Sequence, residues 1–584
     1  MFSFQRCLSR RFSTGAKLSY FAGGGTVRIE YKTIAKQLRD TTSLFPDHFA
    51  VYSEHEGKRL TYAELLGRVE KVAAGLLGLG LQRQARVGVY SPTMLDYYVI
   101  QLACSMADLV LVNINPGYRL YELEYALNKV ECEALFIVSQ VKTTNYVDML
   151  QNIAPNIGKV NQGKPMSEKV PSLKFVGKID KNKTKGYLTV DEILSLGSSD
   201  ENIRRLREIE VQTQPEDLTN IQFTSGTTGS PKASCLSHFN ILNNGLMIAR
   251  QVNFNESDKI LCSVPLYHCF GMVICNMAVL CSGAEALYPS PTFEPLTSLK
   301  VASDKGATSL YGVPTMFIEM INQVERNPGI YDLSKVRGGI MAGSICPRPL
   351  MEKSRTFLNC NELCIAYGMT ETSPVSVMTS SKDELEKQVS TVGRVMPNTE
   401  CKLVDKSGRA VALGEIGEIC TRGYLVMQGY WNDEAATKSS IDKDGWMHTG
   451  DIGVFDEEGF LTIAGRIKDM INRGGENVFP KEIEEYMLRH PKVFNVQVFS
   501  YPDERFGEEV FCWIKVREGE TMTNKEVLTY CKGNIAHFKI PKYLKFVDSF
   551  PITVTGKPQK FKMTESMVEE VKLNPQVLAL YKLR

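Results

Sequence analysis

Three features are missing from this chain: an excess of charge of one sign, an apolar run long enough to span a membrane, and a cysteine spacing typical of a metal finger. The 584 residues include 68 Lys and Arg against 66 Asp and Glu, which gives a formal net charge of +2. This balance does not favour binding to a nucleic acid or an anionic membrane, and no local basic block suggests either partner. We therefore do not expect either class of partner.

The cysteines and the most apolar stretch exclude two further classes. Fifteen cysteines are scattered without a Cys-x-x-Cys pair or a Cys/His cluster at metal-ligand spacing, so we interpret them as reduced thiols of an intracellular protein. Residues 270–280 are the most apolar run, but Asn276 interrupts it and Ser282, Gly283 and Glu285 follow. A run this short and polar predicts a buried helix and no transmembrane segment.

The first 29 residues have a composition of their own. They contain several serines and no acidic residue before Glu30, and their basic residues are Arg6, Arg10, Arg11, Lys17 and Arg28. This composition is typical of a mitochondrial transit peptide, which predicts a protein of the mitochondrial matrix. The sequence Arg10-Arg11-Phe12-Ser13 resembles a matrix-protease site with cleavage after Phe12. The alternative is a disordered basic tail on a cytosolic protein.

Helix and strand patterns alternate along the body of the chain. A capping box at Thr61 and Glu64 precedes apolar residues at helical spacing, and residues 86–90, 109–112 and 134–139 have the pattern of short buried strands. Such alternation predicts an α/β fold with largely parallel sheets. Residues 155–215 are richer in Lys, Asn, Ser and Gly, and we interpret them as a polar excursion.

The length exceeds what one hydrophobic core usually supports, so at least two domains are expected. The best boundary lies near residues 464–469, after a turn-rich β pattern. Beyond it, residues 480–490 predict a helix, and residues 493–498 and 510–516 predict strands. The C-terminal part therefore has the size and pattern of a separate module.

A loop rich in hydroxyl groups and glycine follows the apolar start of a strand at residues 221–223. It consists of Thr224, Ser225, Gly226, Thr227, Thr228, Gly229, Ser230, Pro231 and Lys232. Glycines let backbone N–H groups approach phosphate oxygens, hydroxyls add donors, and the lysine supplies a positive charge. The order of residues does not fit a Walker A loop. The loop predicts polyphosphate binding, and the alternative is a flexible surface loop.

Four further blocks follow this loop. They are Tyr367-Gly368-Met369-Thr370-Glu371-Thr372, His448-Thr449-Gly450-Asp451, Gly465-Arg466-Ile467-Lys468-Asp469 and Thr555-Gly556-Lys557. In order and approximate spacing, the five blocks resemble the adenylate-forming superfamily. Within it the chain is most similar to the acyl-CoA synthetases, particularly the mitochondrial medium-chain type. The resemblance implies a large multi-layered N-terminal domain with a β-rich portion over residues 30–465, and a small mobile α+β C-terminal domain over residues 466–584.

The resemblance also implies a reaction. A carboxylic acid, expected to be a medium-chain fatty acid, attacks the α-phosphate of Mg-ATP to give acyl-adenylate and pyrophosphate, and the thiol of coenzyme A then displaces AMP. The acid is expected to lie between residues 267–280, residues 311–316 and the stretch after Glu371. Alternatives are an aromatic-acid ligase of the coumarate type, a luciferase-like oxygenase that shares the adenylation step, and a non-catalytic acyl or nucleotide sensor.

The resemblance assigns the catalytic groups. Lys557 is expected to bridge the attacking carboxylate and the α-phosphate, where negative charge accumulates. Glu371 supplies the kind of oxygen ligand that Mg²⁺ prefers, and Thr370 donates to the α-phosphate. His268 is expected to border the acyl pocket as a gate or orienting group, and its alternative is a satisfied core histidine.

The nucleotide is expected to contact three of the blocks and the segment before them. Tyr367 offers a flat face to adenine, and Gly343 and Ser344 line the other side of the slot. Asp451 accepts hydrogen bonds from the ribose hydroxyls, and Arg466 assists it.

The second half-reaction is assigned to the C-terminal part. Lys468 stands at the hinge position, and Gly474, Gly475 and Glu476 are expected to face the pantetheine tunnel of coenzyme A. The alternative for the two glycines is an ordinary turn.

Two residues depart from the family pattern. Ala233 stands where a glycine usually follows the loop lysine, and it should be tolerated if its φ is negative. Pro558 stands where a branched aliphatic residue often follows Lys557, and it is expected to slow adenylation or the domain swing because it fixes the local backbone.

Overall fold

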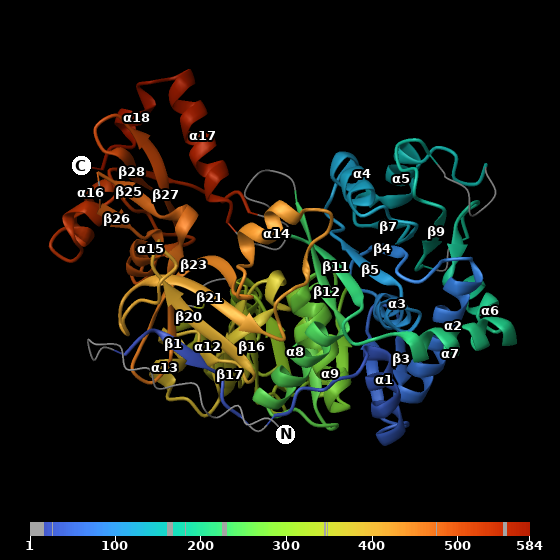
Figure 1. Cartoon of the computed structure of the whole chain (residues 1–584). Helices are drawn as coiled ribbons and strands as arrows, with labels where there is room; N and C mark the ends of the chain where they lie inside the picture. The colour runs from blue at the N-terminus through green and yellow to red at the C-terminus, as the bar shows by residue number, and fades with distance from the viewer. Residues whose placement is uncertain are drawn as a thin grey trace. The chain divides into compact units, whose positions relative to one another are not determined.

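The computed structural model describes residues 17–25, 27–159, 167–180, 183–224, 231–343, 346, 348–474, 476–552 and 558–583. Contacts divide the chain into two compact units (Figure 1). Unit 1 comprises Met1–Phe21, Cys401–Cys420 and His448–Arg584, and unit 2 comprises Ala22–Glu400 and Thr421–Met447.

The first sheet of unit 2 has eight described strands in the order β10-β9-β6-β4-β5-β11-β12-β22. They are β4 (Arg86–Tyr90), β5 (Val110–Ile114), β6 (Ala134–Ile137), β9 (Phe175–Lys178), β10 (Leu188–Thr189), β11 (Leu218–Thr224), β12 (Lys232–Ser237) and β22 (Gly429–Tyr430). The three strands predicted first along the chain are confirmed, two of them with shifted ends. The pairs among β4, β5, β6, β9 and β11 are parallel, as expected of strands that are apolar on both faces.

The second sheet of unit 2 has nine described strands in the order β19-β18-β17-β16-β15-β13-β14-β2-β3. They are β2 (Phe49–Ser53), β3 (Lys58–Thr61), β13 (Lys259–Cys262), β14 (Glu285–Tyr288), β15 (Ser309–Gly312), β16 (Gly338–Ala342), β17 (Glu362–Gly368), β18 (Val375–Met378) and β19 (Arg394–Val395). The strands from β17 to β2 pair in parallel, and antiparallel strands close both ends. The predicted α/β class with largely parallel sheets is confirmed.

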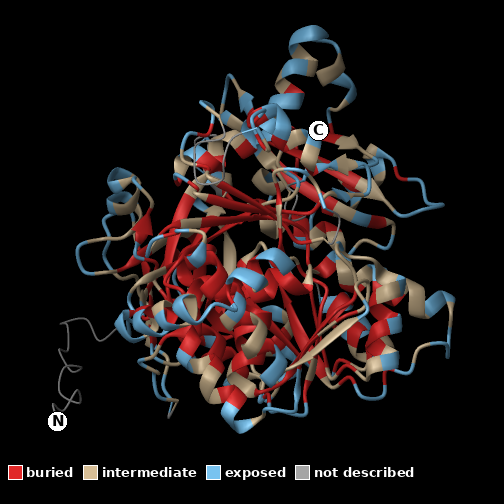
Figure 2. Cartoon of the chain, turned by 90° about the vertical axis from the view of Figure 1, so that its right-hand side faces the viewer, coloured by how far each residue is buried: buried red, intermediate tan, exposed pale blue. Residues whose placement is uncertain are grey.

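Helices connect and cover these sheets. The described helices of unit 2 include α1 (Ile34–Leu44), α2 (Tyr62–Gly78), α3 (Leu95–Met106), α4 (Leu120–Lys129), α5 (Tyr146–Ile153), α6 (Val190–Leu196), α7 (Asp200–Gln212), α8 (His238–Gln251), α9 (Asn276–Ser282), α10 (Pro295–Lys305), α11 (Pro314–Arg326), α12 (Arg348–Leu358), α13 (Leu385–Ser390) and α14 (Glu434–Ser440). Figure 2 shows buried residues along the strands and inner helices, and exposed residues on outer helices and loops. The apolar side chains of the sheets therefore form the core.

The start of α2 follows the predicted capping box. The backbone N–H of Glu64 donates to Thr61 Oγ1 at 3.2 Å, and the backbone N–H of Thr61 donates to Glu64 Oε2 at 2.8 Å. Leu65, Val69 and Val72 are then fully buried on one side of the helix. Sequence pattern, cap and packing agree here, as they do in well-specified helices.

The apolar run at residues 270–280 is a buried helix, as predicted, but its geometry is not uniform. A π-helix, η1 (Phe270–Cys275), precedes α9 (Asn276–Ser282). Every residue of η1 is buried. Single π-turns are uncommon and occur often at functional sites, and this one begins two residues after His268.

The segment at residues 155–215, interpreted from its composition as a polar excursion, contributes to the first sheet. It contains β9 and β10 at the sheet edge, followed by α6 and α7. Lys178 lies on β9 with only 1% of its side chain exposed, and its Nζ donates to Thr184 Oγ1 at 2.9 Å. The polar composition of residues 155–215 therefore corresponds to an edge of the sheet, where polar side chains find partners.

Unit 1 contains two further sheets. The first has the order β1-β20-β21-β23-β24, with β1 (Tyr20–Ala22), β20 (Thr399–Val404), β21 (Gly417–Gly423), β23 (Met447–Phe455) and β24 (Leu461–Arg466). The second has the order β26-β25-β28-β27, and β29 pairs with β28. Its strands are β25 (Ile471–Arg473), β26 (Glu476–Val478), β27 (Val493–Asp503), β28 (Gly507–Val516) and β29 (Tyr543–Phe546).

The C-terminal helices of unit 1 are α15 (Pro480–Leu488), α16 (Asn524–Cys531), α17 (Lys560–Leu573) and α18 (Val577–Leu580). The predicted helix at 480–490 and both predicted strands are confirmed, and the strands are longer than predicted. Together these elements form an α+β region with its own buried apolar cluster. No helix in the described ranges combines the length and the apolar character that crossing a membrane would require.

Candidate active site

The carboxyl ends of β13, β15, β16 and β17 lie along one edge of the nine-stranded sheet, because these strands are parallel and in register. A predicted site segment follows each strand: residues 265–271, 313–316, 342–344 and 368–372. Ligands in open α/β sheets usually bind beyond the carboxyl ends of the strands. The fold of unit 2 thus brings together segments that are up to a hundred residues apart in sequence.

Glu371 is the buried carboxylate at this edge. It lies on the short helix η2 (Thr370–Thr372) directly after β17, and it is only 5% exposed. Its backbone carbonyl accepts from the N–H of Met427 at 3.0 Å. Gly368 permits this turn, because a Cβ there would meet the carbonyl oxygen of Pro374 at 1.7 Å. The tight turn fixes where Thr370 and Glu371 stand.

Tyr430 connects Glu371 to the predicted phosphate loop. Its hydroxyl donates to Glu371 Oε1 at 2.9 Å, and Lys232 Nζ lies 4.8 Å from the centre of its ring. Burial, together with the neighbouring Glu371 carboxylate, raises the pKa of Tyr430, so the phenol stays a neutral donor. No sequence signal points to Tyr430, since it belongs to none of the five blocks and is 59 positions from Glu371.

The two strands that flank the predicted phosphate loop, β11 and β12, pair in antiparallel fashion. Thr224 at the end of β11 pairs with Lys232 at the start of β12, and the carbonyl of Pro231 accepts from the Tyr125 hydroxyl at 3.1 Å. The loop residues Ser225, Gly226, Thr227, Thr228, Gly229 and Ser230 lie outside the described residues. Ala233 lies within β12, paired with Phe223, and is not among the residues with positive φ. The condition set for tolerating alanine at this position, a φ that is not positive, is therefore met.

His268 and Thr370 are joined through Cys269. The backbone N–H of Phe270 donates to His268 Nδ1 at 3.2 Å, and Cys269 Sγ lies 3.6 Å from the same nitrogen. Cys269 Sγ also lies 3.8 Å from Thr370 Oγ1. In this arrangement Nδ1 acts as a hydrogen-bond acceptor for the backbone. This arrangement is compatible with the expected gate and not with a base acting through Nδ1.

Gly343 and Tyr367 end two neighbouring strands. Gly343 follows β16 with φ of +92°, a left-handed conformation that favours glycine. Tyr367 pairs with Val377 of β18 and is partly buried. Ser344 lies outside the described residues.

Asp451 and Arg466 form an ion pair in unit 1. They face each other across β23 and β24, and Arg466 Nε lies 2.9 Å from Asp451 Oδ1. The Asp451 backbone N–H donates to Thr449 Oγ1 at 3.1 Å, and Gly450 has φ of +71°. The two predicted ribose-site residues are therefore held together by their strands before any ligand is considered.

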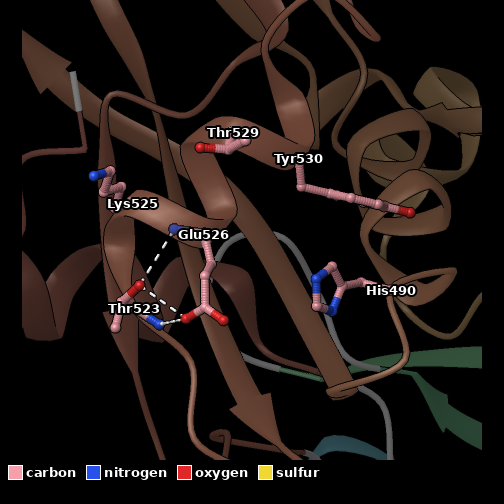
Figure 3. A pocket seen from close by; sticks show the side chains of 6 residues that line it. All are labelled: His490, Thr523, Lys525, Glu526, Thr529 and Tyr530. Atoms are coloured by element: carbon pink, nitrogen blue, oxygen red, sulfur yellow. Dashed lines mark hydrogen bonds between the residues drawn. The ribbon is translucent and has the colours of Figure 1, made fainter.

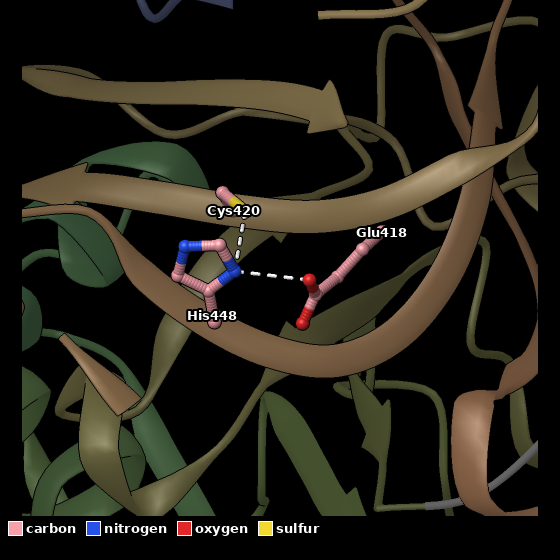
Figure 4. A group of neighbouring side chains, drawn as sticks. All are labelled: Glu418, Cys420 and His448. Atoms are coloured by element: carbon pink, nitrogen blue, oxygen red, sulfur yellow. Dashed lines mark hydrogen bonds and ion pairs between the residues drawn. The ribbon is translucent and has the colours of Figure 1, made fainter. Parts of the chain in front are cut away.

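A cluster of three side chains includes His448, which lies three positions before Asp451 in the chain (Figure 4). His448 Nδ1 lies 2.9 Å from Glu418 Oε2 and 3.4 Å from Cys420 Sγ. The hydrogen bonds with Cys420 and Glu418 raise the pKa of His448 to about 10, while burial raises the pKa of the Cys420 thiol. The sequence did not predict this cluster, because its members are about 30 positions apart and belong to two separate strands.

The remaining predicted residues lie in the C-terminal part of unit 1. Lys468 is exposed on a short helical turn, η3 (Ile467–Asp469), between β24 and β25. Gly474 has φ of +60°, and its N–H donates to the Phe506 carbonyl at 2.9 Å. Glu476 begins β26 and is exposed.

Two of the predicted residues of this part, Gly475 and Lys557, lie outside the described residues. The described residues Ile552 and Pro558 form an antiparallel bridge. Pro558 therefore takes part in backbone pairing, and its effect on rate stays a prediction.

One further pocket lies in unit 1, with a volume of about 400 Å³ (Figure 3). Its lining residues are His490, Thr523, Lys525, Glu526, Thr529 and Tyr530. None of the predicted site residues is among them. Thr523 and Glu526 cap α16 with reciprocal hydrogen bonds, and Lys492 pairs with Glu526 at 2.8 Å. The polar groups of this pocket thus serve the fold.

Comparison with known families extends the five-block pattern. A family model described as AMP-binding enzyme matches residues 38–431, and one described as AMP-binding enzyme C-terminal domain matches residues 482–557. The medium-chain acyl-CoA ligase ACSF2, mitochondrial, of Bos taurus is 42% identical over 560 residues, which are 95% of this chain and 91% of that protein. The putative acyl-CoA synthetase YngI of Bacillus subtilis (strain 168) is 39% identical, covering 93% of this chain and 98% of that protein.

Solved structures have the same fold. The crystal structure of ATP-bound MatB from Rhodopseudomonas palustris has a TM-score of 0.77 at 27% identity and covers 92% of this chain and 99% of its own. The anthranilate CoA ligase AuaEII, in complex with anthranoyl-AMP, has a TM-score of 0.82 at 21% identity and covers 94% and 99%. The similarity to AuaEII shows a shared fold alone.

Proposed function

The chain belongs to the AMP-binding enzyme family, and from this premise we propose that it is an acyl-CoA ligase that forms an acyl-adenylate from Mg-ATP and then a thioester with coenzyme A. The observation that carries the proposal is the constellation of Lys232, Tyr430 and Glu371 beside the carboxyl end of β17. A phosphate-loop cation and a buried carboxylate, both in contact with one phenol, suit a polyphosphate with a bound divalent cation.

The first step needs positioning and charge neutralisation, because a carboxylate is a weak nucleophile toward a polyanion. Glu371 would hold Mg²⁺, and the ion supplies neutralisation of the phosphate charges when bound. The residues present fit this ion, since Glu371 offers a hard oxygen donor in a buried setting. Tyr430 fixes the orientation of the carboxylate, and Lys232 with its loop holds the phosphates.

The nucleotide and the reacting carboxylate are assigned to further residues. Asp451 accepts from the ribose hydroxyls, with Arg466 orienting its carboxylate. Tyr367 stacks on adenine beside Gly343 and Ser344. Lys557 stabilises the charge that develops between the acid and the α-phosphate.

The acid is proposed to be a medium-chain fatty acid. Residues 270–275 of η1 are buried and apolar, and apolar walls are what an alkyl chain requires. His268 borders this wall, and Thr370 lies on the other side of Cys269. The relatives called medium-chain acyl-CoA ligase support an intermediate chain length.

The thioester step is assigned to the C-terminal part. We take residues 30–465 as the adenylation domain and residues 466–584 as the small domain, with Lys468 as the hinge. Gly474, Gly475 and Glu476 are placed at the passage for pantetheine, where glycine allows a slender ligand to approach the backbone.

The location is proposed to be the mitochondrial matrix. The vertebrate relatives include the word mitochondrial in their names, and residues 1–29 have the composition of a transit peptide. N-terminal sequencing of the protein recovered from mitochondria should begin at Ser13. A cytosolic protein that begins at Met1 would contradict this assignment.

The ligase proposal is tested with a series of acids. Pyrophosphate release and thioester formation are measured with Mg-ATP, coenzyme A and saturated acids from short to long chains, together with benzoate and coumarate. We expect a maximum at intermediate length, and about a hundredfold loss of kcat for Glu371→Gln because a charge-stabilising ligand is removed. The exposed Glu386→Gln serves as matched control and should keep full activity.

The contrary outcomes are distinct. A maximum with the aromatic acids would assign the chain to the coumarate type. Nucleotide binding without pyrophosphate from any acid would replace the ligase with a sensor.

A further inference from the structure

The cluster of Glu418, Cys420 and His448 has the composition of a transition-metal site. It offers one carboxylate oxygen, one sulfur and one imidazole nitrogen, and all three donor atoms lie within 4.8 Å of one another. Carboxylate, thiolate and imidazole are the side-chain groups that bind Zn²⁺. We propose that these three residues bind a Zn²⁺-type divalent ion, with a fourth coordination position open to solvent.

The strand arrangement preorganises the three donors. Glu418 and Cys420 are two positions apart on β21, so their side chains point to the same face of the sheet. His448 comes from β23, the neighbouring strand. Figure 4 shows one nitrogen of the imidazole facing both the Glu418 carboxylate and the Cys420 sulfur. Donors fixed on adjacent strands lose little conformational freedom when an ion binds.

The distances suit tetrahedral coordination. With bond lengths of about 2.3 Å to sulfur and about 2.0 Å to nitrogen or oxygen, a tetrahedral ion separates sulfur from nitrogen by about 3.5 Å and nitrogen from oxygen by about 3.3 Å. The corresponding distances here are 3.4 Å from Cys420 Sγ to His448 Nδ1 and 2.9 Å from His448 Nδ1 to Glu418 Oε2. For these two pairs an ion requires shifts of only a few tenths of an ångström, and the third pair, Cys420 Sγ and a Glu418 carboxylate oxygen, lies within 4.8 Å.

Neighbouring backbone groups orient the Glu418 carboxylate. The N–H of Gly450 donates to Glu418 Oε1 at 3.2 Å, and Oε2 is the oxygen that faces His448. Thr449 Oγ1 donates to the carbonyl of Ile419 at 2.8 Å, which ties the two strands together beside the cluster. Second partners of this kind fix metal ligands in place and raise the affinity of a site.

Exposure leaves a path for the ion and a place for water. The side chains of His448 and Glu418 are 29% and 21% exposed, whereas Cys420 is buried. Three protein ligands with one accessible position is the form of an open zinc site. The sulfur donor favours Zn²⁺ and similar ions over Mg²⁺ and Ca²⁺, which prefer oxygen.

The test uses Co²⁺ as a spectroscopic probe for Zn²⁺ with the full-length protein, in the absence of ATP and acid. A cobalt–thiolate bond gives a near-ultraviolet charge-transfer band. We expect this band to appear with one Co²⁺ per chain, to vanish when Zn²⁺ displaces the probe, and to be absent in Cys420→Ser. The matched control is Cys281→Ser, the described cysteine that is not buried, which should keep the band.

Two further measurements make the test of the metal site unambiguous. Glu418→Gln, which retains the hydrogen-bonding shape, should bind Co²⁺ at least about tenfold more weakly. Zn²⁺ should raise the Tm of the wild type and not that of Cys420→Ser, because only the native site binds the ion. The same scans report whether each variant is folded.

The opposite outcomes are equally clear. A folded wild type without the thiolate band would overturn the site, and so would a band that persists in Cys420→Ser. Both readouts concern the metal alone and need no turnover. Failure of the ligase proposal would therefore leave this test standing.

Discussion

At the scale of single residues, the chemistry proposed for unit 2 depends on one buried carboxylate and the groups that hold it. Glu371 accepts from Tyr430, whose ring also lies beside Lys232. Sequence blocks identified Glu371 and Lys232, since both stand in blocks whose order resembles the family pattern. Tyr430 could not be found that way, because its role arises from the pairing of β12 with β22.

Replacing Tyr430 by phenylalanine isolates the hydrogen bond. The ring beside Lys232 remains, while the donor to the Glu371 carboxylate is lost. Hydrogen bonds to charged groups contribute about 1.5–3 kcal/mol, so we expect kcat/KM for ATP to fall about 10- to 100-fold. Steady-state pyrophosphate release at varied ATP concentration measures this value.

The matched control for this substitution is Tyr424→Phe. Tyr424 is also a buried tyrosine of unit 2, and its hydroxyl accepts from Asn244 Nδ2 at 3.5 Å, away from the predicted site residues. It should leave kcat/KM unchanged even if stability falls. Equal losses in the two variants would mean that the effect of Tyr430 is only structural.

His238 makes a residue-scale prediction about pH. It is fully buried, its Nδ1 accepts from the N–H of Ile34 at 3.4 Å, and burial lowers its pKa from 6.5 to about 4. The unfolded chain therefore binds more protons between these values, and stability is lost as pH falls through this window. We expect a loss of about 1.5 kcal/mol in the free energy of unfolding between pH 6.5 and about pH 5.

The non-titrating variant His238→Asn provides the comparison. It keeps an acceptor near Ile34 and cannot gain a proton, so the pH slope in this window should be flatter than in the wild type. Urea unfolding at a series of pH values gives both slopes. Parallel curves would show that other groups cause the acid destabilisation.

At the scale of elements, the parallel strands explain why distant blocks meet. β13, β15, β16 and β17 end at one edge, and each is followed by a predicted segment. The alternation of patterns was enough to predict this class of sheet. It was not enough to give strand lengths in the C-terminal part, where Pro502 breaks the β pattern although β27 continues to pair with β28 up to Asp503. Proline is tolerated near a strand end, beside the hairpin turn.

Gly368→Ala tests the turn between β17 and η2. A Cβ would lie 1.7 Å from the carbonyl oxygen of Pro374, so the backbone must move and take Glu371 with it. We expect a loss of about 1–3 kcal/mol in stability, typical of overpacking, together with a lower kcat for adenylation. Chemical denaturation and pyrophosphate release measure the two effects.

Gly67→Ala is the control, and it should change the stability in the opposite direction. Gly67 lies within α2, has no heavy atom within 4 Å of its added Cβ and has no positive φ. Alanine there should stabilise the helix by up to about 1 kcal/mol and leave activity unchanged. If Gly368→Ala behaved like Gly67→Ala, the account of the turn would be wrong.

At the scale of the whole molecule, the predicted groups divide between two units. Unit 2 contains Lys232, Glu371 and His268, and unit 1 contains Asp451 and Arg466. The assignment to a family followed from the order of five blocks, because order along a chain is visible in a sequence. The cluster at Glu418 was missed, since only the pairing of strands places its members together.

The most direct test of the account separates the two half-reactions in Lys557→Ala. A charge-stabilising lysine at the α-phosphate is needed for adenylation and not for thiol attack on a ready-made adenylate. The account predicts that pyrophosphate release from acid and Mg-ATP falls at least about a hundredfold, while thioester forms from supplied acyl-adenylate and coenzyme A near the wild-type rate. The control Lys562→Ala, on α17, should retain both activities. Normal adenylation by Lys557→Ala, or equal loss of both half-reactions with the fold intact, would contradict the account.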